Sequence, residues 1–134
     1  MLGFVILRKT GTLRGWKDMT SYKRGDVILV RFPYADLTHY KKRPALIVLG
    51  DAVQSEFNQT IAVMITSNMQ RTGPTRIPIN MQDAAAQAMG LITDSVIVTD
   101  HLATIEEREI DKKIGHCPLM AEVDKALKIT LGLS

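Results

Sequence analysis

The sequence predicts a mainly β fold with attached helices, an α+β architecture with one small, strongly bent antiparallel sheet or barrel. Short segments rich in β-branched residues recur along the chain between turn residues, and one well-patterned helix follows them at the C-terminus. A chain of 134 residues can bury one hydrophobic core without disulfide or metal support. We therefore expect a single domain.

The first half of this domain is expected to hold three strands, where β-branched and aromatic residues cluster. They cover residues 26–32 (DVILVRF), 44–49 (PALIVL) and 60–66 (TIAVMIT). The nearly continuous apolar run of the second is typical of a strand buried on both faces, with Pro44 at its start or on an edge. The polar residues 34–42 are expected to form a loop, and residues 52–58 to form one or two helical turns.

The second half is expected to add shorter strands and two helices. The strands cover residues 76–79 (RIPI), 95–99 (SVIVT) and a further pairing at 103–105. A short helix is expected over residues 80–89, with Gly90 closing it. The strongest helical pattern covers residues 118–131 and ends at Gly132, and its apolar positions share one face: Leu119, Val123, Ala126, Leu127 and Leu131.

Charge and cysteine content narrow the class of protein. The net charge is +3, and residues 1–21 hold four of the 17 Lys/Arg and one of the 14 Asp/Glu. Thirteen cations and thirteen anions remain, so the predicted domain is neutral and its total charge indicates no partner. Cys117 is the only cysteine, and no second thiol or histidine cluster stands at metal-ligand spacing. We expect a cytoplasmic protein without a metal or other cofactor.

The N-terminal residues show no clear periodicity. Their apolar run at 1–7 precedes the basic residues, the reverse of a secretory signal, and it is too short to span a membrane, so no membrane association is expected. Because Met19 lies just before the first strand, we expect residues 1–18 to be a disordered or non-native extension and residues 19–134 to form the domain. N-terminal sequencing of natively expressed protein tests this expectation, and Met1 or Leu2 as first residue would contradict it.

Polar residues at strand ends are the candidates for chemistry, because the sequence has no nucleotide-binding glycine loop, paired-histidine motif or glycine-flanked serine. The basic run 41–43 (KKR) directly precedes a predicted strand. Such a run is most often a solvated loop. Residues 66–68 (TSN) follow the third strand, and in the simplest interpretation they cap a turn.

The order of several short motifs resembles the MazF/PemK/Kid toxin family over residues 22–133. These motifs are YKRGDV at 22–27, KRPALIV at 42–48, ITS at 65–67, GL at 90–91, DSVI at 94–97, TI at 104–105 and the C-terminal helix. The resemblance implies an SH3-like barrel that forms a homodimer, is inhibited by a cognate antitoxin protein and cuts single-stranded RNA without metal. DNA would be reached only through an antitoxin complex. In that family the arginine before proline and the threonine that ends the third strand are catalytic, which implies Arg43 and Thr66.

The residue types suit this chemistry. If the ribose 2′-OH attacks the adjacent phosphate, the enzyme must supply a proton acceptor, a proton donor and stabilisation of phosphoryl charge. The Arg43 guanidinium is a rigid fork of donors for phosphate but a poor base, while Thr66 and Ser67 can add hydrogen bonds. Asp100 occupies the place of an acidic residue found in some members of the family, and His101 follows it. The arginine two residues earlier in some members is Val98 here, so the proton acceptor stays open between Asp100 and His101.

Several side chains are candidates for binding the RNA. They are Lys41, Lys42, Ser67, Asn68, Tyr34 and His39. Aromatic residues make up 5% of the chain, so stacking of bases would depend on few side chains, and Tyr34 fits a place in the core equally well.

Two other functions fit a fold of this kind. One is a non-catalytic toxin that binds and traps a DNA gyrase-like enzyme, and the other is an inactive nucleic-acid-binding barrel whose polar strand ends are only turns. Arg43 together with Thr66 distinguishes the ribonuclease from both, because RNA cleavage needs these groups and a pure binding protein does not.

Overall fold

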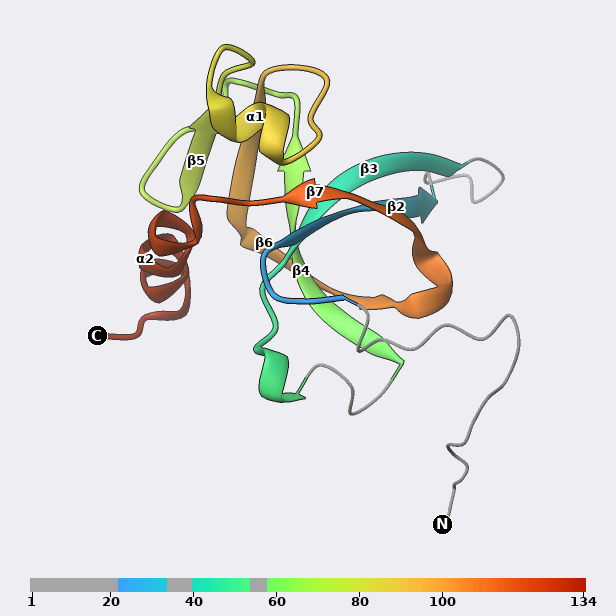
Figure 1. Cartoon of the computed structure of the whole chain (residues 1–134). Coiled ribbons are helices and arrows are strands. Elements are labelled where there is room, and N and C mark those ends of the chain that lie inside the picture. The colour runs from blue at the N-terminus through green and yellow to red at the C-terminus, as the bar shows by residue number, and fades with distance from the viewer. Residues whose placement is uncertain (1–21, 34–39, 54–57) are drawn as a thin grey trace.

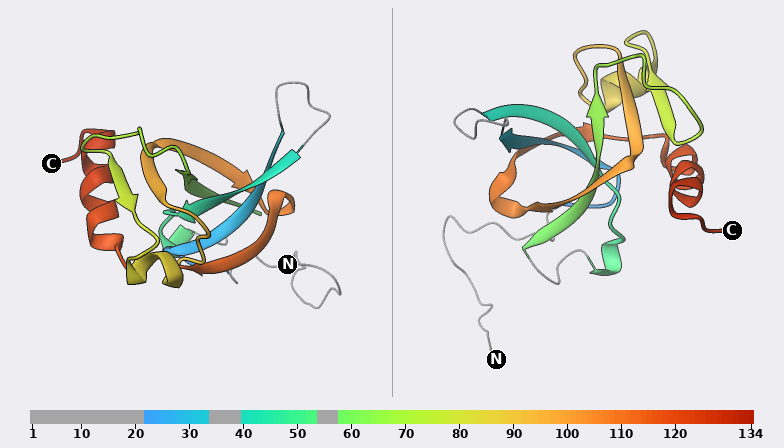
Figure 2. Two further views of the ribbon diagram at one scale, coloured as in Figure 1. Left: turned by 90° about the horizontal axis from the view of Figure 1, so that it is seen from above. Right: turned by 180° about the vertical axis from the view of Figure 1, so that it is seen from behind.

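The computed structural model describes residues 22–33, 40–53 and 58–134, and its main feature is a six-stranded sheet with the order β5-β6-β4-β3-β2-β7. Every neighbouring pair is antiparallel. The strands are β2 (Asp26–Pro33), β3 (Tyr40–Ile47), β4 (Gln59–Thr66), β5 (Arg76–Ile79), β6 (Ser95–Glu106) and β7 (Ile110–His116). The sheet curls strongly and two helices lie at one end of it (Figures 1 and 2). The predicted mainly β fold with attached helices is confirmed; Tyr34, His39 and the expected extension at 1–18 lie outside the described residues.

Strand β3 begins earlier than the sequence indicates. Residues 40–42, expected in a loop, pair with β2, and Pro44 lies within the strand opposite Leu29 rather than at its start. Pairing with β4 begins only at Ala45. At Pro44 the strand therefore has a neighbour on one side only, which allows a residue without a backbone N–H.

Strand β6 joins two segments that the sequence predicts separately. Val98 lies opposite Met64 and Leu102 opposite Val63, so residues 99–101 form a bulge within one continuous strand. Because the residues of this bulge are polar, the sequence pattern predicts that a strand ends there.

Strand β7 is absent from the sequence-based expectations. Three consecutive charged residues, Asp111, Lys112 and Lys113, interrupt its apolar pattern, and Ile110 is its only buried residue. His116 is the final residue of this strand.

The helices are shorter than predicted. Helix α1 covers Ala84–Ala88, because residues 80–83 form a turn in which the Asp83 carboxylate accepts a hydrogen bond from the Asn80 N–H. Gly90 follows it with φ +74°, as expected for a residue that closes a helix. Helix α2 covers Met120–Leu131 and ends at Gly132, also as predicted. Short 3₁₀ turns occupy Asp51–Val53 and Glu107–Glu109. Of the helical turns expected at 52–58, residues 54–57 lie outside the described residues. No helix among the described residues is long and apolar enough to cross a membrane.

Both faces of the sheet are buried, because residues two apart in each strand contribute to the same face. One cluster lies under the helices and includes Val27, Leu46, Val63, Ile97, Met89 and Val123. The other lies on the opposite face and includes Ile28, Ala45, Ile47, Ala62, Ile105 and Ile110. This double burial explains the continuous apolar runs of the central strands.

Candidate functional site

A pocket of about 430 Å³, here called the basic pocket, lies where β2, β3, β4 and β7 meet the loop between α1 and β6. Its apolar lining comes from Leu29, Pro44, Ile65, Leu91, Ile92 and Ile114. Its polar lining comes from Lys41, Lys42, Arg43, Ser67, Thr93, Ser95 and Lys112. The structure thus brings the predicted basic run and the end of the third strand to one site.

Arg43 is a half-buried residue of β3 that lines this pocket. It lies opposite Val30 of β2. The β3–β4 pairing ends at Ala45 and Met64, and Arg43 and Thr66 each lie two residues beyond that pair, so both come at the same end of the two strands. Within the described ranges, the Arg43 guanidinium makes no hydrogen bond or ion pair, so its donors are available to a ligand.

Thr66 ends β4 and holds the turn that follows. Its hydroxyl oxygen accepts a hydrogen bond from the Asn68 N–H at 3.1 Å, and the Asn68 side-chain oxygen accepts one from the Gln70 N–H at 3.0 Å. The simple turn-capping interpretation is therefore confirmed for Thr66 and Asn68. A hydroxyl that accepts in this way still has its own hydrogen to donate. Thr66 does not line the basic pocket, whereas its neighbours Ile65 and Ser67 do.

Cations outnumber anions at the rim of the pocket. The Lys42 ammonium forms an ion pair with Asp111 at 3.3 Å, and Arg31 approaches the same carboxylate at 3.9 Å. Lys41 and Lys112 have no ion-pair partner in the part of the chain that the structure describes. The domain is neutral in total, yet this site has a positive field suited to a phosphate chain. The sequence patterns do not identify Lys112 as a site residue, because they do not predict the strand that carries it.

Asp100 lies in the β6 bulge, away from Arg43. Its two carboxylate oxygens accept hydrogen bonds from Arg76 at 3.1 and 2.9 Å, and the Thr75 hydroxyl donates a third at 3.2 Å. The hydrogen bonds from Arg76 hold the pKa of the Asp100 carboxyl below its usual value. Since β4 separates β6 from β3, this pair lies about 10 Å or more, two strand spacings, from Arg43. His101 is exposed beside it and, like Asp100, does not line the basic pocket.

The described residues offer no obvious place for a metal ion. No group of three or more His, Cys, Asp or Glu side chains is placed to hold one within these ranges. Cys117 is buried, its sulfur accepts a hydrogen bond from the Leu119 N–H at 3.3 Å, and burial raises the pKa of its thiol. An un-ionised thiol is a poor nucleophile, so Cys117 is a core residue.

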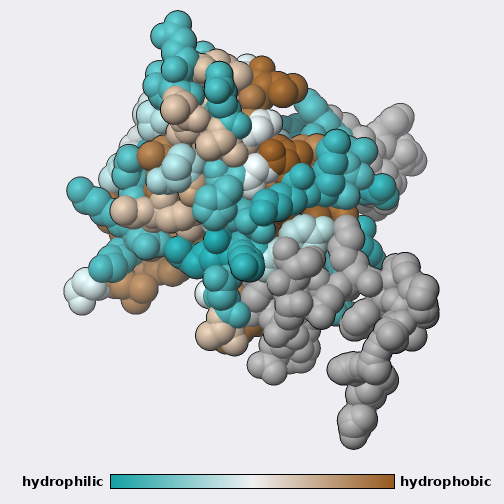
Figure 3. Space-filling model, in the orientation of Figure 1, coloured by the Kyte–Doolittle hydropathy of each residue, from teal (hydrophilic) through white to brown (hydrophobic). Residues whose placement is uncertain are grey.

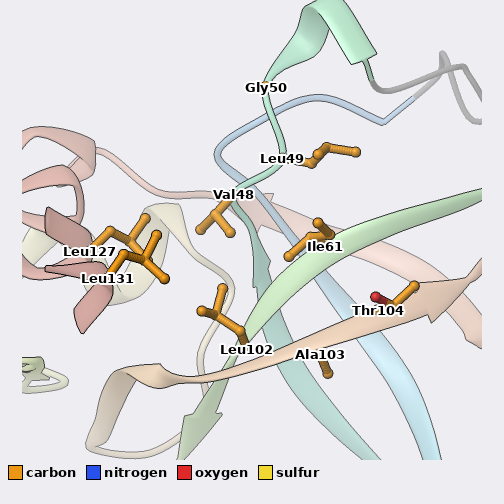
Figure 4. Close-up of a pocket in the computed structure, with 9 residues that line it drawn as sticks. All are labelled: Val48, Leu49, Gly50, Ile61, Leu102, Ala103, Thr104, Leu127 and Leu131. Atoms are coloured by element: carbon orange, nitrogen blue, oxygen red, sulfur yellow. The ribbon is translucent and has the colours of Figure 1, made fainter. Parts of the chain in front are cut away.

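A second, apolar hollow of about 430 Å³ lies between α2 and the sheet. Leu127 and Leu131 point toward it from α2, and Ile61 of β4, Leu102 of β6 and Val48, which follows β3, face them (Figure 4). The apolar surface continues around the end of α2, where Ile129, Leu131 and Leu133 are 49, 54 and 60% exposed. Hydrophobic residues gather at that end of α2 on an otherwise largely hydrophilic face (Figure 3).

Residues 23–131 match the family model described as PemK-like, MazF-like toxin of type II toxin-antitoxin system. The chain is 33% identical over 116 residues to Endoribonuclease EndoA of Bacillus subtilis (strain 168), covering 83% of this chain and 95% of that protein.

Solved structures show the same fold. An endoribonuclease from Mycobacterial species is 26% identical with a TM-score of 0.63, and the match covers 86% of this chain and 95% of the other. An endoribonuclease in complex with its cognate antitoxin, also from Mycobacterial species, is 25% identical with a TM-score of 0.66. The match covers 84% of this chain and 97% of the other. A MazE–MazF structure from Deinococcus radiodurans is 20% identical with a TM-score of 0.67, and the match covers 84% of this chain and 97% of the other. At this identity it supports the fold alone.

Proposed function

Because the chain belongs to the family of PemK-like and MazF-like toxins of type II toxin–antitoxin systems and is an endoribonuclease, we propose that it cleaves single-stranded RNA at specific sequences without a metal ion. One observation carries the proposal: Arg43, with no partner for its guanidinium among the described residues, lines a cation-rimmed pocket beside the end of β4. Cleavage of messenger RNA in the cytoplasm accords with its single cysteine and its toxin family.

In the proposed reaction the substrate supplies its own nucleophile. The ribose 2′-oxygen forms a bond to the neighbouring phosphorus while the bond to the 5′-oxygen breaks, which leaves a 2′,3′-cyclic phosphate and a 5′-hydroxyl. Arg43 donates to the phosphoryl oxygens, whose negative charge increases in the transition state. The Thr66 hydroxyl donates to the same phosphate group, and Asn68 holds that hydroxyl in place. Lys41, Lys42 and Ser67 bind the chain on either side.

Proton transfer needs a further group, and Asp100 and His101 are its two candidates. A carboxylate whose pKa is lowered by Arg76 is a weak base, so the geometry favours a structural role for Asp100. The His101 imidazole has ring nitrogens that can accept or donate a proton by residue type. Since it precedes Leu102, which lines the apolar hollow, subunit association across that hollow would place His101 near the boundary between two copies.

The role of Asp100 is tested by Asp100→Asn. We expect RNA cleavage within a few-fold of wild type, because the ion pair with Arg76 is structural, whereas loss of a general base costs about 10²–10⁴-fold. Stability should change with pH. Because the pKa of Asp100 is lowered in the folded state, the ion pair stabilises the fold above about pH 4 and this contribution is lost as the pH falls through the lowered pKa.

Thermal unfolding of wild type and Asp100→Asn between pH 7 and pH 2 checks this. The difference in Tm should be small, because the pair is partly exposed, and should shrink in acid. Glu122→Gln, a charge removal on the exposed side of α2, is the control. A hundredfold loss of cleavage in Asp100→Asn would instead identify Asp100 as the base.

We also propose that a cognate antitoxin protein inhibits this chain, as the antitoxin complex of its mycobacterial relative suggests. Any contact with DNA would be made through that complex. The excess of cations around the basic pocket would attract an acidic antitoxin segment as well as RNA.

We propose that the chain forms a homodimer through the apolar hollow and the end of α2. Leucine and isoleucine side chains are exposed around this hollow, and covering them with another apolar surface lowers the free energy. A second copy can use the same patch, because a two-fold axis brings identical surfaces together.

This proposal predicts that Leu131→Lys yields a monomer. The introduced charge would have to be buried in the interface, while in the single subunit the side chain is 54% exposed and its replacement should not unfold the domain. Light scattering after size-exclusion chromatography measures the mass. Met69→Lys, a comparable change at a 38% exposed residue outside the hollow, should remain dimeric. A Leu131→Lys dimer would place the interface elsewhere.

Incubation of the purified wild-type protein with a long, unstructured RNA in excess EDTA tests the central proposal. We expect cuts at a small set of related sequences, with cyclic phosphate at the 3′ ends and hydroxyl at the 5′ ends. Intact RNA under these conditions, with cleavage restored by Mg²⁺, would contradict metal independence. Intact RNA under both conditions would contradict the assigned substrate.

A further inference from the structure

Ile92 stands out on the surface because its side chain is 93% exposed on the loop between α1 and β6. It lines the basic pocket on one side and, on the other, a polar hollow of about 490 Å³ whose lining includes Asn80, Gln82 and Asp94. Figure 3 shows hydrophobic atoms on this loop. A ligand that fills either hollow would cover apolar surface of this isoleucine, which is favourable in water.

The loop that carries Ile92 is held in place. The Leu91 N–H donates to the Ala86 carbonyl at 3.0 Å. The Asp94 carboxylate accepts from the Met81 N–H at 2.7 Å, and the Ser95 hydroxyl donates to the Thr93 carbonyl at 2.8 Å. Hydrogen bonds therefore fix the loop on both sides of Ile92. A fixed wall loses little conformational entropy on binding, which favours recognition.

The basic pocket has an apolar part and a cationic part, which match the base and the phosphates of a nucleotide. Its floor is aliphatic, formed by Leu29, Ile65 and Ile114, and its rim carries the cations of Lys41, Arg43 and Lys112. A volume of about 430 Å³ falls within the range of small-ligand pockets. An unpaired base has a flat apolar face and polar edges and is joined to anionic phosphates, so it can fill the pocket while its phosphates stay at the rim.

We propose that the basic pocket binds one unpaired base of the RNA next to the scissile phosphate, and that Ile92 is the apolar wall against which this base packs. The proposal rests on the proposed ribonuclease function, because it assigns Arg43 of the same pocket to the phosphate. Ile92 determines specificity at that position: the distance between this wall and the aliphatic floor selects among bases by size, and Ser67 and Thr93 offer hydroxyls to the base edge.

Lys112 is assigned to the phosphate on the rim of the pocket. It lies in the middle of β7, lines the pocket and has no ion pair within the described ranges. Lys112→Ala should weaken cleavage by a similar factor for every base, and should reduce the dependence of RNA binding on salt, because it removes a charge and no base contact.

The test compares wild type and Ile92→Ala on short RNAs that carry each of the four bases at every position around one mapped cut site. For the preferred base at a single position, kcat/KM should fall about tenfold in the variant, while preferences at the other positions stay unchanged. An abasic nucleotide at that position should lower the kcat/KM of the wild type by a similar factor. The kcat/KM of Ile92→Ala should be the same for the abasic RNA and for the RNA with the base. A purely structural effect of the substitution would not show this dependence on the base.

Val53→Ala is the matched control, since Val53 is 49% exposed on a 3₁₀ turn and lines neither hollow beside Ile92. Equal Tm values exclude unfolding as the cause. Cleavage by Ile92→Ala with an unaltered base preference would overturn the assignment, and so would loss of antitoxin binding with normal RNA preference, which would identify a peptide site. Failure of the wild type to cut any RNA would instead count against the proposed function.

Discussion

Replacing Arg43 with alanine is expected to lower kcat for RNA cleavage about a thousandfold. In the proposed mechanism the guanidinium donates to phosphoryl oxygens whose charge increases in the transition state, and removing even one such neutral donor from an enzyme costs about 10²–10³-fold. KM should rise much less, because Lys41, Lys42 and Lys112 line the same pocket and continue to hold the RNA. Single-turnover kinetics on a short RNA in EDTA separates the two effects.

Three further variants define what Arg43 contributes. Arg43→Lys keeps the charge but loses the planar fork, so its activity should fall between wild type and alanine. Thr66→Ala should cost less than Arg43→Ala, because it removes one neutral donor. Lys125→Ala removes an exposed cation of α2, outside the pocket, and should be neutral. Cleavage at the wild-type rate by Arg43→Ala, with an unchanged Tm, would contradict the assignment of this residue.

Local sequence patterns predicted most strands because each central strand is buried on both faces and is therefore continuously apolar. That Arg43 and Thr66 come at the same end of β3 and β4 follows from the same patterns once these two strands are antiparallel neighbours. The turn before β2 has a local signal of its own, the glycine at position 25. Gly25 there has φ +96°, and the buried Asp26 next to it accepts a hydrogen bond from the Lys23 N–H and pairs with Lys113 at 3.2 Å.

Other features depend on contacts that a local pattern does not contain. Strand β7 has three charged residues in succession and is a strand only because β2 provides its hydrogen-bonding partners. Lys112 could therefore not be placed at the pocket from the sequence. Ile92 lies in a loop between two predicted elements, and its position at the basic pocket depends on how α1 packs on β7. The bulge at residues 99–101, which takes Asp100 to Arg76, likewise depends on pairing with β5.

The packing of α1 on β7 leads to the largest expected effect on stability. A Cβ atom on Gly115 would lie 2.4 Å from the Ala88 carbonyl oxygen and 2.4 Å from the Met89 carbonyl carbon. From the other side, a Cβ on Gly90 would lie 2.2 Å from the Ile114 carbonyl oxygen, and Gly90 also has φ +74°. Both contacts are with backbone, which cannot move aside as a flexible side chain can. The two glycines therefore allow the end of the helix and the strand to approach closely.

Gly115→Ala is expected to lower the free energy of unfolding by about 3 kcal/mol or more, because the added methyl must separate α1 from β7. For a domain of this size such a loss lowers Tm by about 10–20 °C. Gly50→Ala is the matched control, since a Cβ there meets no atom within 4 Å, and its free energy of unfolding should change by less than about 0.5 kcal/mol. Urea denaturation measures both. Equal stability of the two variants would mean that α1 does not lie against β7 this closely. Gly90 and Ile114 also line the basic pocket, so separation of α1 from β7 should reduce RNA cleavage even below the unfolding temperature. The contact between α1 and β7 therefore helps to set the shape of the site.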